Sequence, residues 1–107
     1  MYFVKIKNNY FHNILNFIDD ENNNAKDWVS QLENITLSQK DLYQALKLIT
    51  KIANNHHRYP NLYNKIDQFL LHFKKNIIDN YSNNEIFNIC KCNKRILLFM
   101  IENKIIN

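Results

Sequence analysis

Residues 38–53, SQKDLYQALKLITKIA, carry the clearest structural signal in the chain. The apolar members of this stretch recur three and four residues apart, at Leu42, Ala45, Leu46, Ile49, Ile52 and Ala53. That spacing places them on one face of a helix. Ser38 precedes the stripe and Asp41 lies three residues further on, which is the arrangement of a hydroxyl and an acid that caps a helix start. The stretch therefore predicts an amphipathic helix that begins after Ser38.

The composition favours helices over the whole chain, because none of the 107 residues is glycine. Phosphate-cradling loops, dinucleotide-binding turns and nucleophile elbows need glycine, and so do tight two-residue hairpins. With 46% hydrophobic and 22% charged residues, the chain has enough apolar material for one small core. We therefore expect one all-α domain over residues 1–107, in which asparagine takes the left-handed turn positions that glycine would otherwise fill.

Apolar stripes of the same period predict further helices on both sides of residues 38–53. They cover residues 2–18, 25–35, 62–77, 85–90 and 94–106, the last two preceded by a Ser82–Glu85 capping box and by Asn93 as a cap. The short polar turns between them favour antiparallel neighbours, so we expect about six antiparallel helices. A shared core is predicted from the largest apolar residues of these stripes: Trp28, Leu46, Ile49, Phe69, Leu70 and Phe73.

The last predicted helix contains a run of six apolar residues, from Ile96 to Ile101. Six consecutive residues cover every side of a helix, and a helix that is apolar all round is normally covered all round. Residues that point away from the upstream helices are expected to form an exposed apolar stripe. The candidate interaction surface therefore includes Leu97, Leu98, Phe99, Met100 and Ile101, and self-association through the last helix is one expected consequence.

Much of the sequence resembles an uncharacterised helical domain that opens many protist ankyrin-repeat proteins. The stretches that carry the resemblance are residues 16–21 (NFIDDE), 48–58 (LITKIANNHHR), 81–89 (YSNNEIFNI) and 93–106 (NKRILLFMIENKII). This resemblance implies a non-enzymatic protein–protein interaction module that forms the N-terminal helical cap of an ankyrin-repeat-type protein, with a protein partner. It transfers no catalytic residue.

Residues 82–106 also have the length and helix pattern of one ankyrin-type helix pair. The Thr-Pro-Leu-His start and the closing glycine of a true repeat are missing. We therefore expect all-α helical hairpins that end in a degenerate, ankyrin-like capping pair, because terminal repeats are atypical.

Few residues suggest chemistry. His56, His57 and Arg58 form the most conspicuous polar cluster and join the candidate interaction surface, but a metal site would need a third ligand, and His72 is fifteen residues away. Cys90 and Cys92 are spaced too closely for a loop-closing disulfide and lack the second pair of a zinc site, so inert, partly buried thiols are expected. We predict no catalytic residue, no metal and no cofactor.

The net charge leaves one alternative to a protein–protein interaction module. The formal charge of +4 suggests a small basic helical domain that binds nucleic acid or an acidic partner, although the densest basic stretches are short and nucleic acid is the less favoured ligand. The first ten residues lack the pattern of a secretory signal, and the longest apolar run is far shorter than the roughly 20 residues that span a bilayer. These features predict a cytoplasmic protein without a membrane partner.

Overall fold

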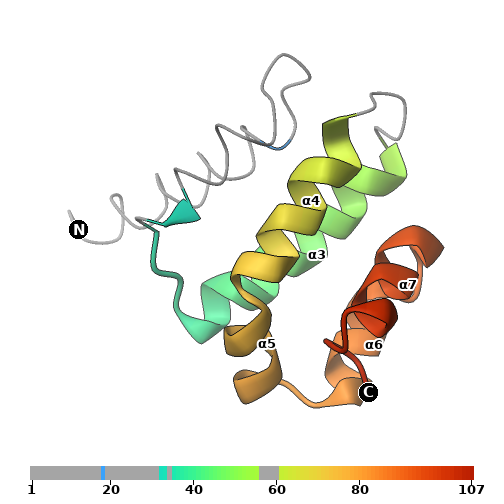
Figure 1. The fold of residues 1–107 in the computed structure, drawn as a ribbon. Helices are drawn as coiled ribbons and strands as arrows, with labels where there is room; N and C mark the ends of the chain where they lie inside the picture. Colours follow the sequence, from blue (N-terminus) through green and yellow to red (C-terminus); the bar gives the residue numbers. More distant parts are fainter. Residues whose placement is uncertain (1–17, 19–31, 34, 56–60) are drawn as a thin grey trace.

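A computed structural model describes residues 18, 32–33, 35–55 and 61–107. In this part of the chain there are α-helices and no strands, which confirms the all-α class (Figure 1). The helices are α3 (Gln39–Asn55), α4 (Asn61–His72), α5 (Lys74–Asn80), α6 (Asn83–Cys90) and α7 (Lys94–Glu102). Most of the helices predicted over residues 2–18 and 25–35 lies outside the described residues, which include only 18, 32, 33 and 35 of those ranges. Trp28, His56, His57 and Arg58 also lie outside them.

Three helices begin where capping residues predict: α3 after Ser38, α6 after Ser82 and α7 after Asn93. The Oγ of Ser38 accepts from the Asp41 N–H at 3.2 Å, directly before α3. At α6 the capping box is complete, because the Oγ of Ser82 accepts from the Glu85 N–H at 3.2 Å and the Glu85 carboxylate accepts from the Ser82 N–H at 3.0 Å. Each cap provides an acceptor for an N–H group that lacks a partner in the first turn of the helix.

The prediction of a single helix over residues 62–77 is wrong, because the structure has two helices that meet at Phe73. Phe73 has φ −95° and ψ 10°, and α5 continues after it in a new direction. The backbone bonds bridge the break, since the Phe73 N–H donates to the Phe69 carbonyl and the Ile77 N–H donates to the Phe73 carbonyl. The bend keeps both α4 and α5 against α3, and the Tyr81 hydroxyl at the end of α5 donates to the Gln39 carbonyl at the start of α3.

The last helix is shorter than the predicted range 94–106, because α7 ends at Glu102 in a Schellman motif. Lys104 has φ 59°, the Ile105 N–H donates to the Met100 carbonyl and the Lys104 N–H donates to the Ile101 carbonyl. Ile105 is buried like Met100, which supplies the apolar contact typical of this motif. The left-handed position is therefore held by a lysine rather than by an asparagine, contrary to our expectation.

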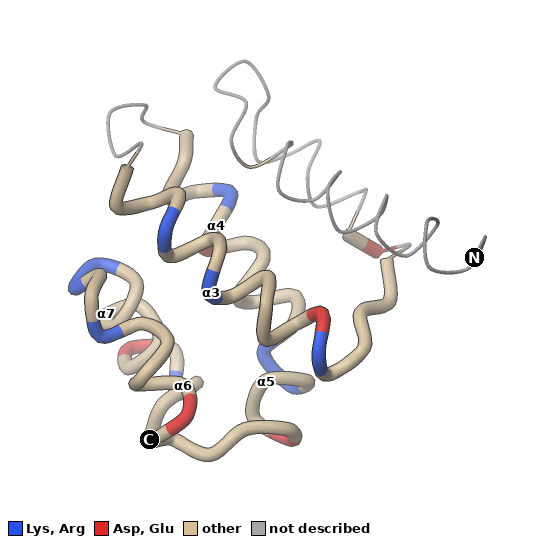
Figure 2. Tube along the Cα trace, turned by 180° about the vertical axis from the view of Figure 1, so that it is seen from behind, with Lys and Arg blue, Asp and Glu red and all other residues tan. Residues whose placement is uncertain are grey.

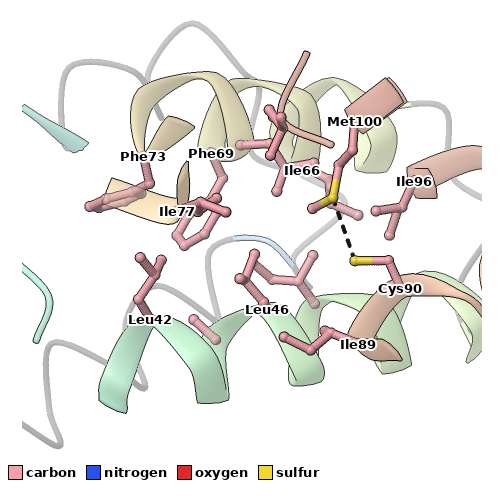
Figure 3. Close-up of a cluster of buried hydrophobic side chains, with 14 of the residues drawn as sticks. Leu42, Leu46, Ile66, Phe69, Phe73, Ile77, Ile89, Cys90, Ile96 and Met100 are labelled. Atoms are coloured by element: carbon pink, nitrogen blue, oxygen red, sulfur yellow. Dashed lines mark hydrogen bonds between the residues drawn. The ribbon is translucent and has the colours of Figure 1, made fainter. Parts of the chain in front are cut away.

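The core lies between α3 and the other described helices. Figure 3 shows Leu46, Phe69 and Phe73 pointing into it. Ile49 and Leu70 are buried in the same core. Phe69 and Phe73 stack at a tilted angle with ring centroids 4.8 Å apart. Two polar residues inside it had no sequence signal: Thr50, whose hydroxyl donates to the Leu46 carbonyl at 2.9 Å, and Lys65, which is fully buried.

Candidate interaction surface

The outward face of α7 carries the exposed part of the apolar run. Leu98 is 45% exposed and Ile101 is 49% exposed, and they lie three residues apart, about one turn. Ile96 and Met100 are buried and define the inward side of the helix. With about 100° between successive residues, Leu98 falls opposite that side, and Ile101 about 120° away from it. Leu98 and Ile101 therefore form the centre of the candidate surface.

The other predicted members of this surface differ in position. Leu97 and Phe99 lie at the two flanks of α7 and are half-buried. Met100 is fully buried, so its assignment to the surface is wrong: its sulfur lies 3.6 Å from the Cys90 Sγ inside the core (Figure 3). The physical reason is that Met100 is four residues after Ile96, on the same inward side of the helix.

Phe87 of α6 is a further exposed apolar residue, 45% exposed, which is not among the predicted members of the surface. Its signal was present in the spacing. Ile86, Ile89 and Cys90 follow the helical period and are buried, which leaves Phe87 about 107° away from the centre of the buried side of α6. α6 and α7 form a helical hairpin, because Asn83 at the start of α6 exchanges two hydrogen bonds with the backbone of Asn107, at 3.0 and 3.3 Å.

The start of α7 is fixed by a polar network around Asn93, which is only 6% exposed. The Asn93 Oδ1 accepts from the Ile96 N–H at 3.0 Å and so caps the helix. The Asn93 Nδ2 donates to the Asn54 Oδ1 at 2.9 Å and to the Tyr63 hydroxyl at 3.2 Å. One buried side chain therefore connects the first turn of α7 to the end of α3 and to α4.

Arg95 borders this network on the outside. Its guanidinium donates to the Asp67 carboxylate at 3.1 Å, and it lies over the Tyr63 ring, 5.0 Å from the centroid, and the Phe99 ring, 5.9 Å from the centroid. Burial raises the pKa of Asp67, and the hydrogen bond and charge of Arg95 partly offset that effect. Arg95 therefore covers one flank of the α7 face with a cation whose charge is already paired.

The two cysteines have different environments. Cys90 is buried, and desolvation raises the pKa of its thiol to about 11. Little thiolate forms at neutral pH, so this thiol is a poor nucleophile and a poor metal ligand. Cys92 is exposed and accepts a hydrogen bond from the Asn54 Nδ2 at 3.5 Å. The expectation of partly buried thiols therefore holds for Cys90 and is wrong for Cys92, which lies in the three-residue turn between α6 and α7.

A groove of about 280 Å³ runs between α3 and α6. Its lining consists of Tyr43, Lys47, Thr50, Lys51, Asn54, Asn88, Ile89 and Cys92. Two lysines and two amides line this groove, and no carboxylate does. The groove is thus positively charged, and it shares no residue with the apolar face of α7.

Within the described residues, no cluster of three or more histidine, cysteine, aspartate or glutamate side chains could hold a metal ion. His72, which is described, is exposed at the end of α4. Among the described helices, none has the length and hydropathy needed to cross a bilayer.

Comparisons with protein-family models, with curated protein sequences and with solved structures find no match to this chain. The likeness to the helical domain of ankyrin-repeat proteins consequently rests on the sequence stretches quoted above.

Proposed function

We propose that this chain is a non-enzymatic protein–protein interaction module that docks through the outward face of α7. The observation that carries the proposal is the pair Leu98 and Ile101, both close to half exposed and one turn apart. Two adjacent leucine-sized side chains left in water are a source of association energy, because burial of apolar surface is worth about 25 cal/mol per Å². Leu97 and Phe99, half-buried on the flanks, widen the same face.

The partner that fits this face best is another helix pair stacked on α6 and α7. α6 has eight residues and α7 has nine, short helices of the kind that stack in ankyrin-type arrays. A pair at the end of such an array keeps an apolar side for its neighbour and a polar side for solvent. This is the arrangement that the resemblance implies for residues 82–106, and it makes the chain the N-terminal cap of a helical array.

A second copy of the chain is the partner available in a purified sample. The apolar faces of two copies can bury each other, because neither carries a charge that would repel the other. If the two contacting surfaces differ, head-to-tail stacking continues without closure. We therefore expect the purified full chain to self-associate reversibly at micromolar concentration.

Sedimentation velocity on the full chain tests this proposal. The double variant Leu98→Ser/Ile101→Ser should sediment as a monomer at concentrations where the parent associates. The matched control is Leu71→Ser/Ile78→Ser, which removes two other exposed apolar side chains, 42% and 40% exposed, from α4 and α5. The control should associate as the parent does. A parent that stays monomeric throughout, or a control that loses association equally, would contradict docking through α7.

A further inference from the structure

The exposed edge of α3 carries a row of regularly spaced side chains. Tyr43, Lys47, Lys51 and Asn54 follow one another at intervals of three or four residues, so they lie on one face of the helix. Thr50 is on the same face and is buried at the bottom of the groove. Figure 2 shows the lysines of α3 beside the basic segment at the α6–α7 turn. This face of α3 therefore presents two cations one turn apart.

The far wall of the groove carries no charged residue. It is formed by Asn88, Ile89 and Cys92 of α6 and the following turn. The carboxylate of Glu85 does not line the groove, because it caps α6 by accepting from the Ser82 N–H. Across the groove the two lysines therefore face one amide, one isoleucine and one thiol, and no acid in its lining neutralises them.

Two further depressions extend the groove toward both ends of α3. One shares Tyr43 with it and adds Lys40, and the other shares Asn54 and Cys92 and adds Lys94 and Arg95. None of the three linings contains a carboxylate. Arg95 is already paired with Asp67, so the uncompensated charge is concentrated at the lysines. At 1.5 Å per residue the 17 residues of α3 span about 25 Å, enough for about seven residues of an extended peptide.

The aromatic rings beside the groove are not free to stack on nucleic-acid bases. The Lys47 Nζ lies over the Tyr43 ring, 5.6 Å from its centroid, and Arg95 covers the Tyr63 ring. Tyr81, in the depression at the start of α3, is buried and packs against Tyr43 with centroids 5.9 Å apart. Single-stranded nucleic acids gain much of their affinity from exposed aromatic platforms, so these covered rings favour a different polyanion.

We propose that the α3–α6 groove binds an extended, carboxylate-rich peptide segment of a partner protein. Carboxylates on alternate residues of an extended chain lie about 7 Å apart, close to the rise of one helical turn that separates Lys47 from Lys51. The amides of Asn54 and Asn88 supply donors and acceptors for the peptide backbone between them. This goes beyond the proposed function, because the groove and the outward face of α7 share no residue, and either site can fail without the other.

Fluorescence anisotropy with the full chain tests the groove. The probes are a fluorescein-labelled (Glu-Ala)₄ peptide, a (Lys-Ala)₄ peptide of the same length and a labelled ten-nucleotide oligothymidine. The test variant is Lys47→Glu/Lys51→Glu. Its matched control is Lys74→Glu/Lys75→Glu on α5, which changes the net charge by the same amount outside the groove. Helical circular dichroism and the thermal midpoint verify that both variants are folded.

The acidic peptide should bind the parent and the α5 control, and the groove variant should weaken that binding at least tenfold, equivalent to about 1.4 kcal/mol. Added salt should also weaken it, because the contacts are ionic. No binding of (Glu-Ala)₄ at low salt would overturn the proposal. Equal loss in both variants would overturn it as well, since only net charge would then matter. Tighter binding of oligothymidine with the same sensitivity to Lys47 and Lys51 would identify the occupant as nucleic acid and refute a peptide.

Discussion

Asn93 is the residue whose replacement tests the described packing most directly. It is 6% exposed, and its one amide makes three hydrogen bonds, to the backbone of α7, to Asn54 and to Tyr63. The change Asn93→Ala removes all three. The change Asn93→Ser keeps an oxygen that caps a helix as well as asparagine does, but this side chain is too short to reach across to α3 and α4.

The two variants separate the contributions of the cap and of the cross-helix bonds. Loss of an N-cap costs about 1 kcal/mol, and loss of each buried neutral hydrogen bond costs about 1 kcal/mol. Asn93→Ala should therefore lower the free energy of unfolding by about 3 kcal/mol and Asn93→Ser by about 2 kcal/mol. A stability of about 5–15 kcal/mol is usual for a small domain, so both variants remain measurable.

Urea denaturation followed by circular dichroism at 222 nm measures both values. Asn84→Ala, an exposed asparagine of α6, is the control and should change stability by less than about 0.5 kcal/mol. In a double-mutant cycle, Tyr63→Phe should couple to Asn93→Ser by about 0.5–1 kcal/mol, because the two residues share one bond. If Asn93→Ala cost less than about 1 kcal/mol, or equalled Asn93→Ser, the network would not hold α7 to α3 and α4.

Further outcomes follow from burial, backbone geometry and thiol environment. Leu46→Ala and Leu70→Ala, both in the core, should each destabilise by about 2–5 kcal/mol in urea, and costs under about 0.5 kcal/mol would refute the helix phases. Lys104→Gly should raise the free energy of unfolding by about 1 kcal/mol, because it relieves the left-handed backbone, and a loss of stability would contradict the Schellman motif. Cys92 should react with Ellman's reagent in the native state and Cys90 only after unfolding, so two rapidly reacting native thiols would disprove the burial of Cys90. The raised pKa of Cys90 means that the folded state keeps its proton longer than the unfolded state, so stability should fall between about pH 9 and pH 11, and less in Cys90→Ala.

The helices and most of their caps could be predicted because their causes are local. A stripe of apolar residues at helical spacing decides which side of α3, α4 or α6 is buried. Ser38, Ser82 and Asn93 act on N–H groups within three residues of themselves, so their role is visible in the sequence. The arrangement of the helices in space required the structure.

The features that could not be predicted depend on distant contacts or on backbone geometry. The sequence around the bend at Phe73 contains no glycine or proline that would predict it. The bend follows from the packing of both α4 and α5 on α3. The left-handed residue is Lys104 because the burial of Ile105 against Met100 stabilises the end of α7. From the sequence alone, Lys47 and Lys51 are indistinguishable from lysines on an ordinary solvated helix face. Only the structure shows that α6 lies beside them and forms the second wall of a groove.

The exposure of Leu98 and Ile101 is imposed by the rest of the fold. The start of α7 is held by Asn93, and its end is held by the Schellman motif at Lys104 and by the hydrogen bonds between Asn83 and Asn107. A rotation of α7 that turned Leu98 inward would expose Ile96 or Met100 and would break the bonds of Asn93 to two other helices. The cost of that rotation, about the 2 kcal/mol assigned to the cross-helix bonds plus the loss of a buried side chain, exceeds the gain from covering one leucine. Among the described residues, the apolar face of α7 is therefore a fixed part of the surface that the packing of α3, α4 and α6 imposes.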